Sequence, residues 1–293
     1  IIASSYFATS GAFSAFTLAF QVPNLIRSLF ADAALSAAFV PVFTELLEKD
    51  KRKEAFQLAS TLFFLIAGVL GVISAAFMLA APYVMPLFTG DTFSQELDDL
   101  TSGLSQVLFP IVVLLGLNGL LQGILNAYDH FTVPAISPVV WNLVILVFLI
   151  GGRSWFEGDE ELYAYAIGVL VGTLVQLLML VPVLSRVGFQ VVPTFRPRDE
   201  RVRQVLLLML PVTIGLGLIN FNLLINSVLG SLVSVEAPAA IDRAFRIYML
   251  PQGVFSVAVA TVLFPALSRL AARRDLDGLR HRSANGVRQI ALL

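Results

Sequence analysis

The sequence predicts an all-α fold, that of a polytopic helical membrane protein, and three observations support this prediction. Of the 293 residues, 57% are hydrophobic and 13% are charged, with a mean hydropathy of +0.85. Soluble domains are about 45–50% apolar and about 25% charged. The apolar residues form long blocks, which is typical of spanning helices and not of the short alternating strands of a barrel. The charged residues gather between these blocks, and their sign alternates along the chain.

The apolar blocks define the predicted spans. The segments are 1–8, 12–47, 55–89, 101–126, 132–151, 161–185, 203–230 and 238–268, with a last one starting near 284. A straight span needs about 20 residues, so the two longest segments are expected to tilt, kink or extend beyond the bilayer. The chain starts without Met inside one apolar segment and stops inside another, so we expect it to be part of a longer protein.

The connections between the segments alternate in charge. Residues 49–54, 186–203 and 269–282 hold fourteen of the nineteen Lys and Arg residues, namely four, five and five. Residues 91–99 and 153–161 each carry four acidic residues, and the two stretches together contain one cation, Arg153. Because cytoplasmic connections are enriched in Lys and Arg, the basic connections are predicted to lie in the cytoplasm and the acidic ones outside.

Arg27 is the most informative single residue, because it lies inside an apolar segment. A cation at the centre of a span costs about 2.5–3.5 kcal/mol even on insertion scales, so it usually faces a cavity and marks a pathway. Pro23 and Pro41 flank it, and a bent helix is where backbone can open to water or ligand. The alternative interpretation is an arginine that extends to a lipid headgroup.

A second group of charges lies near the start of the segment 238–268. Arg243 and Arg246 are three residues apart and share a helix face, and Asp242 can pair with Arg246 at i, i+4 spacing. The alternative is a solvated helix start, where Glu236 and Asp242 favour the N-terminal dipole.

Uncharged polar residues recur inside the spans and are interpreted mainly as interhelical hydrogen bonds, worth about 0.6–2 kcal/mol each. They include Asn118, Gln122, Asn126, Asn142, Gln176, Asn220, Asn222 and Asn226.

Several function classes lack their sequence signatures. There is no cysteine, and we find no G-x-x-x-x-G-K-[ST], H-E-x-x-H or G-x-S-x-G pattern. The connections are too short for a catalytic domain, so we predict that the protein is not an enzyme and has no cofactor. Basic connections beside a membrane are expected from topology, and they indicate no nucleic-acid partner. His130 and His281 are interpreted as ordinary surface residues.

Three sequence blocks carry a resemblance to the MurJ/MviN family of bacterial lipid II flippases, within the multidrug/oligosaccharidyl-lipid/polysaccharide exporter superfamily. The blocks are PNLIR at 23–27 with FAD at 30–32 and AFVP at 38–41; GILNA at 123–127 with Phe131, Pro134, Ala135, Pro138 and Asn142; and Arg246 with PQGVF at 251–255, Ala258 and LFPALS at 263–268. The resemblance implies part of a two-lobe, exporter-type helix bundle. Residues 1–185 would form the first lobe with a truncated start, 186–202 a cytoplasmic linker and 203–293 the beginning of the second lobe.

The resemblance also implies a function and a site. The family moves the undecaprenyl-pyrophosphate-linked peptidoglycan precursor from the inner to the outer leaflet of the bacterial cytoplasmic membrane by alternating access. Arg27 and Arg246 match cavity arginines of the two lobes, whose guanidinium forks suit a diphosphate. Asp32 matches an acidic position that would pair with an arginine when substrate is absent. The full set of expected substrate-binding residues is Asn24, Arg27, Asp32, Asp242, Arg243 and Arg246.

Two positions depart from the family pattern, and two other functions stay open. Ser14 stands where some members have Asp, and Met249 where some have Glu, which bears on cation coupling more than on substrate class. In some members sodium binds in the second lobe, largely beyond residue 293, so we assign no metal site. The expected partners are lipid II and membrane lipids. The open alternatives are an exporter of another polyprenyl-linked glycan or drug, and a non-transporting scaffold that recruits cell-wall or division proteins.

Overall fold

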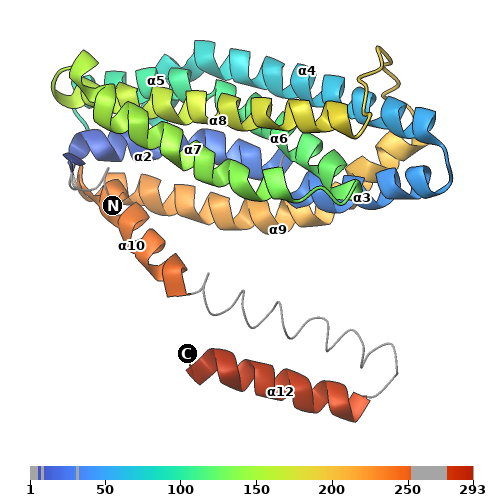
Figure 1. Cartoon of the computed structure of the whole chain (residues 1–293). Helices are drawn as coiled ribbons and strands as arrows, with labels where there is room; N and C mark the ends of the chain where they lie inside the picture. The colour runs from blue at the N-terminus through green and yellow to red at the C-terminus, as the bar shows by residue number, and fades with distance from the viewer. Residues whose placement is uncertain (1–5, 8–9, 31–32, 252–275, 293) are drawn as a thin grey trace. The chain divides into compact units, whose positions relative to one another are not determined.

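The computed structural model describes residues 6–7, 10–30, 33–251 and 276–292, and these are helices joined by turns and connections (Figure 1). The α-helices are α2 (Gly11–Phe30), α3 (Ala33–Glu48), α4 (Arg52–Val84), α5 (Gln95–Leu108), α6 (Pro110–Ala127), α7 (Thr132–Gly151), α8 (Glu161–Arg186), α9 (Glu200–Ser231), α10 (Ala237–Pro251) and α12 (Leu276–Leu292). Short 3-10 helices lie at Met85–Leu87, Arg153–Trp155 and Gly158–Glu160. The chain divides after Ala239 into two compact units, and each is described by itself.

The described residues confirm the predicted class of an all-α membrane protein. Five helical segments among them are long and apolar enough to cross a membrane: Arg52–Leu87, Gln95–Ala127, Thr132–Gly151, Gly158–Arg186 and Glu200–Ser231. Gly11–Ile26 is a shorter apolar helix. The segment predicted at 12–47 is therefore described as two helices, α2 and α3, on either side of residues 31–32.

Two predicted helix starts differ from the structure by six residues or more. The segment expected to begin at 101 begins at Gln95, because the Ser94 hydroxyl accepts a hydrogen bond from the Leu97 amide at 3.4 Å and caps the helix. Glu96 and Asp98 therefore lie in the first turn of α5 instead of a connection, where the helix dipole favours negative charge.

The last helix also differs from the expectation. Helix α12 begins at Leu276, eight residues earlier than the start near 284, and contains Arg280, Arg282 and Arg288. Part of the predicted basic connection is thus helical. Of the segment 238–268, the part beyond Pro251 lies outside the described residues.

Three helices end in the same way, in a left-handed residue that reverses the chain. Asp50, Asp129 and Gly188 have φ of 56°, 57° and 75°. In each case the next amide donates to a carbonyl five residues earlier, at 2.8 Å for Lys51 to Leu46, 2.9 Å for His130 to Leu125 and 3.1 Å for Phe189 to Leu184. This pattern satisfies carbonyls that the helix end would otherwise leave unpaired.

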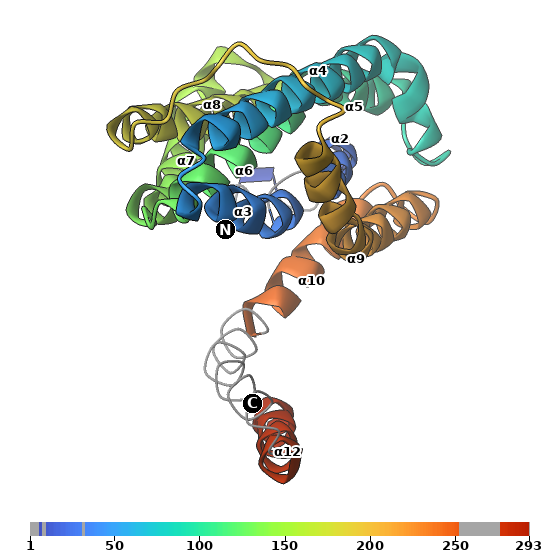
Figure 2. The same ribbon diagram turned by 90° about the vertical axis from the view of Figure 1, so that its right-hand side faces the viewer.

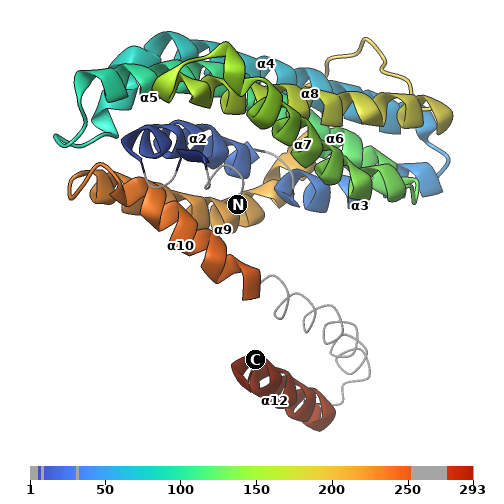
Figure 3. The ribbon, with the colours of Figure 1, turned by 60° about the vertical axis from the view of Figure 1, so that its left-hand side comes forward.

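Two buried apolar clusters hold the unit 1–239 together. One joins α3, α4, α6 and α9 around Phe39, Phe43 and Phe109, and the other joins α2, α5 and α8 around Phe13 and Phe16. Helix α7 packs mainly on α8, and α9 packs on α2 and α3. Figure 3 shows α9 running alongside α2.

The structure separates the basic and acidic connections onto opposite ends of this unit, as the charge pattern predicts. At one end, the Arg201 guanidinium of the 186–203 connection lies 2.7 Å from the Glu54 carboxylate at the start of α4. At the other end, the Thr92 hydroxyl of the acidic connection donates to the Ser231 carbonyl at the end of α9, at 2.5 Å. We refer to these as the basic end and the acidic end.

Candidate functional site

A row of polar side chains runs along one face of α2, in the middle of an otherwise apolar helix. Ser14, Thr17 and Gln21 are 0%, 4% and 9% exposed, and Asn24 is half-buried. Steps of three, four and three residues keep them on one face of the helix. Buried polar groups require hydrogen-bond partners, so this face must meet polar groups of another helix or of the backbone.

The hydrogen-bond partners of Gln21 and Asn24, in the C-terminal half of this row, come from α9. The Gln21 amide nitrogen donates to the Ser227 hydroxyl at 2.8 Å, and the Asn24 amide nitrogen donates to the Asn220 amide oxygen at 2.9 Å. The two bonds pair ascending positions on α2 with descending positions on α9, so the helices are antiparallel. We call Gln21, Asn24, Asn220 and Ser227 the polar seam.

Ser14 and Thr17, in the N-terminal half of the row, form hydrogen bonds with backbone groups instead. The Ser14 hydroxyl accepts a hydrogen bond from the Ala239 amide at 3.2 Å, at the beginning of α10. The Thr17 hydroxyl donates to the Phe13 carbonyl of its own helix at 2.8 Å. The four side chains of this row are uncharged, and the polar seam can both donate and accept hydrogen bonds.

The structure places the predicted first-lobe residues only in part. Asn24 lies in the polar seam. Arg27 belongs to α2, one helical turn after Asn24, but its side chain is not among those described. Asp32 lies outside the described residues.

The predicted charge cluster of α10 is partly confirmed. The Arg246 Nε lies 2.7 Å from the Asp242 Oδ2, which is the predicted i, i+4 pair, and Arg243 is half-buried on the same helix. The Arg246 side chain is 64% exposed, so the pair adds only about 0–1 kcal/mol to stability. Because these residues follow the division after Ala239, the cavity predicted to join Arg27 and Arg246 stays a prediction.

The basic end holds a second arrangement that the sequence did not indicate, the docking of the α8–α9 connection on α4. Figure 2 shows this connection crossing α4 on its way to α9. The Phe189 ring packs edge-on against Phe56, with centroids 5.1 Å apart. The buried Ser60 hydroxyl accepts from the Val192 amide at 2.9 Å, and the Thr61 hydroxyl accepts from the Arg196 amide at 3.4 Å.

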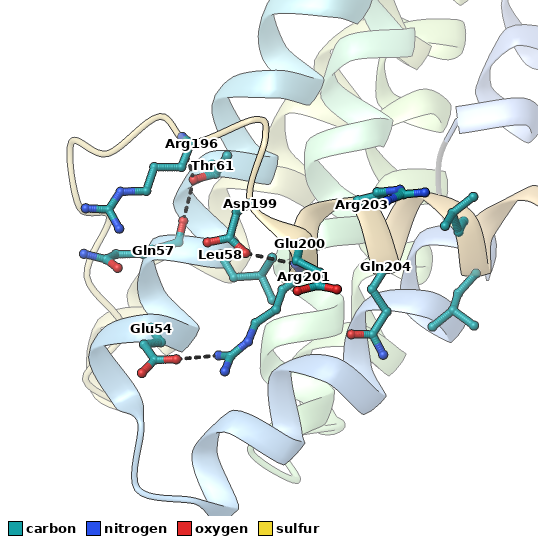
Figure 4. A pocket seen from close by; sticks show the side chains of 12 residues that line it. Glu54, Gln57, Leu58, Thr61, Arg196, Asp199, Glu200, Arg201, Arg203 and Gln204 are labelled. Atoms are coloured by element: carbon teal, nitrogen blue, oxygen red, sulfur yellow. Dashed lines mark hydrogen bonds and ion pairs between the residues drawn. The ribbon is translucent and has the colours of Figure 1, made fainter.

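A cavity of about 870 Å³ lies beside the docked connection (Figure 4). Glu54 and Arg201, which form the ion pair, both line it, and the Asp199 carboxylate caps α9 by accepting from the Arg201 amide at 2.9 Å. In Figure 4, Arg196 lies to the left of Asp199 and Arg203 to its right. The lining contains three arginines and three acids, so the cavity has no excess of positive charge for a phosphate.

The described residues contain no cluster of three or more His, Cys, Asp or Glu side chains that could hold a metal ion. Sequence reasoning overlooked Gln21 and Ser227, which form the most buried bond of the seam. The available signal was the 14, 17, 21, 24 spacing on α2, which marks one polar face.

Comparisons with known proteins give matches along nearly the whole chain. The family model described as "Lipid II flippase MurJ" matches residues 3–293. A protein named "Probable lipid II flippase MurJ" from Treponema pallidum (strain Nichols) is 30% identical over 308 residues, covering 100% of this chain and 56% of that protein. One of the same name from Bdellovibrio bacteriovorus is 34% identical over 271 residues, covering 88% and 50%. The chain thus spans about half the length of the curated relatives it matches.

Two solved structures share the fold. One is titled "Lipid II flippase MurJ, inward closed conformation", with a TM-score of 0.73 at 22% identity, covering 92% of this chain and 54% of that one. The other is an inward-facing multidrug resistance MATE family transporter, with a TM-score of 0.79 at 16% identity, covering 98% and 65%. At these identities the likeness concerns the helix arrangement alone.

Proposed function

We propose a function from one premise: this chain belongs to the lipid II flippase MurJ family. The protein moves a polyprenyl-diphosphate-linked peptidoglycan precursor between the leaflets of the bacterial cytoplasmic membrane, by alternating access. The match over residues 3–293 carries this proposal. The protein acts as a transporter and not as an enzyme.

The proposal assigns the parts of the chain as follows. Residues 1–185 belong to a first lobe, 186–202 link the lobes on the cytoplasmic side and 203–293 begin a second lobe. The separation of basic and acidic ends supports this orientation, because basic connections are retained in the cytoplasm. The docking of the connection on α4 supports a linker that holds a fixed path.

The charged head of the substrate meets residues from α2 and α10. We propose that Arg27 and Arg246 bind the diphosphate, with Asn24, Asp32, Asp242 and Arg243 around them. The i, i+4 bond between Asp242 and Arg246 supports a role for the acid in holding the guanidinium until an anion arrives. An anion bound by several guanidinium groups forms strong, charge-assisted hydrogen bonds.

The polar seam supports alternating access. Helix α9 begins the proposed second lobe, yet it contacts α2 of the first lobe through two hydrogen bonds between uncharged side chains. When such helices separate, water can form hydrogen bonds with their polar faces, whereas the separation of an apolar interface would expose apolar side chains to water. An interface of this kind can open and close repeatedly.

The test is rescue of bacteria depleted of their own lipid II flippase. The full-length protein should restore growth, and R27Q or R246Q should lower transport at least about tenfold, because each removes charge-assisted hydrogen bonds worth about 1.5–3 kcal/mol. R186Q is the matched control, since Arg186 is an exposed cation in the last turn of α8. Normal expression without rescue would contradict the proposal and favour another lipid-linked substrate.

A further inference from the structure

Within the part of the chain that the structure describes, the amide oxygen of Gln21 in the polar seam has no hydrogen-bond partner. Gln21 is 9% exposed, and its amide nitrogen donates to Ser227, but its carbonyl oxygen Oε1 is buried without a partner among the described residues. Leaving a buried acceptor unsatisfied lowers stability, because the group has given up its hydrogen bonds to water. An orphaned group of this kind in a native structure calls for a physical explanation.

We propose that the polar seam is a binding surface for the uncharged, hydroxyl-bearing sugars of the lipid-linked substrate, reached when α2 and α9 separate. Gln21 Oε1 accepts a hydrogen bond from a sugar hydroxyl or acetamido N–H group. This inference rests on the proposed function and extends it from the diphosphate to the glycan. It assigns a role to Gln21, Asn220 and Ser227, which the family resemblance did not single out.

The orphaned atom itself can pair with a hydrogen-bond donor of a sugar, but not with a phosphate oxygen. A carbonyl oxygen only accepts hydrogen bonds, and phosphate oxygens at neutral pH are also acceptors, so the two repel each other. Sugar hydroxyls donate and accept, which matches the mixed amide and hydroxyl groups of the seam. All four seam residues are uncharged, so none of them offers a cation to an anion.

The energies favour a seam that opens at modest cost. Interhelical hydrogen bonds in membranes are individually weak, and those from Gln21 to Ser227 and from Asn24 to Asn220 join the closed seam. The unmet acceptor at Gln21 opposes them. Opening therefore exchanges two modest bonds for hydration or substrate contact, and it relieves the orphaned acceptor.

The position of the seam fits a ligand whose diphosphate is held by Arg27. Asn24 lies three residues before Arg27, and Gln21 lies six residues before Arg27. At a rise of 1.5 Å per residue, these separations are about 4.5 Å and about 9 Å along the helix axis. The first sugar of a lipid-linked glycan is bonded directly to the diphosphate. A diphosphate near Arg27 would bring that sugar to the level of Asn24 and Gln21.

The test compares two ligands on the purified full-length protein: lipid II and undecaprenyl diphosphate, which has the same anionic group and no sugars. Q21M keeps the side-chain length and removes the acceptor. We expect Q21M to weaken lipid II binding about tenfold and to change undecaprenyl diphosphate binding less than twofold. Q21E keeps an acceptor at the same place and should retain the ratio of the two dissociation constants.

N118L is the matched control, because the Asn118 side chain is 2% exposed on α6 and its amide oxygen is likewise buried without a partner. It should leave the ratio unchanged. Equal losses of both ligands in Q21M, an unchanged ratio in Q21M or a lost preference in Q21E would overturn the inference. A wild-type protein that binds neither ligand would instead refute the proposed function. Thermal unfolding of each variant shows whether it is folded.

Discussion

Removing the Ser227 hydroxyl should destabilise the protein more than removing both partners of its hydrogen bond. Ser227 is fully buried, and its hydroxyl accepts from the Gln21 amide nitrogen at 2.8 Å. In S227A the Gln21 amide nitrogen loses its acceptor. Because the Gln21 amide oxygen already lacks a partner among the described residues, both polar atoms of the amide would then be unsatisfied. Because a buried unsatisfied group costs about 1–3 kcal/mol, we expect the free energy of unfolding to fall by that amount.

The double variant reverses this effect. When both partners are replaced by apolar groups of similar shape, the change is nearly neutral or even stabilising. Q21M/S227A also removes the orphaned Oε1, so it should be at least as stable as the wild type. The double-mutant cycle thus predicts strong coupling, with S227A alone the least stable of the three variants.

Unfolding in mixed micelles, titrated with SDS and followed by fluorescence of Trp141 and Trp155, measures these differences. S105A is the control, because Ser105 is equally buried but its hydroxyl bonds to the Thr101 carbonyl of its own helix, at 2.8 Å. If S227A is no less stable than S105A, or if the two substitutions at the seam simply add, the hydrogen bond does not join α2 to α9 as described.

Three further predictions concern the ends of the bundle. Cysteines introduced at Ser94 and Thr194 should react with an impermeant reagent from opposite sides of the membrane, with the Thr194 site on the cytoplasmic side; reaction from one side would refute the proposed orientation. S60A should speed amide exchange in residues 187–199, because the Val192 amide loses its partner, whereas S185A at the exposed end of α8 should not. E54Q should leave the thermal unfolding temperature nearly unchanged, because both side chains of the Glu54–Arg201 pair are partly exposed and solvent screens their attraction; a clear drop would show that this pair anchors the connection.

Local patterns made most of the fold predictable. The need for about 20 apolar residues to cross a bilayer fixes a span whatever it packs against, and 132–151 coincides with α7. The Asp242–Arg246 pair followed from i, i+4 spacing alone. The separation of the basic and acidic connections onto opposite ends followed from their charge, which needs no knowledge of helix packing.

Features that depend on distant contacts were not predictable in the same way. Gln21 and Ser227 are 206 residues apart, and Asn24 and Asn220 are 196 apart. A helix face that is polar over 14, 17, 21 and 24 indicates that a polar partner exists, but it does not say which helix supplies it. The docking of the α8–α9 connection depends on Ser60, a single hydroxyl that looks like any other small residue in a span.

The same physics explains why the seam is polar at all. An apolar interface between α2 and α9 would gain little from association inside the bilayer, because lipid tails solvate leucine as well as a neighbouring helix does. Hydrogen bonds supply direction and register, since Gln21 can meet Ser227 only when the helices are aligned. They also leave a surface that water or sugars can wet once the helices part. We therefore interpret the Gln21 acceptor as part of an interface that must be specific when closed and compatible with a polar ligand when open.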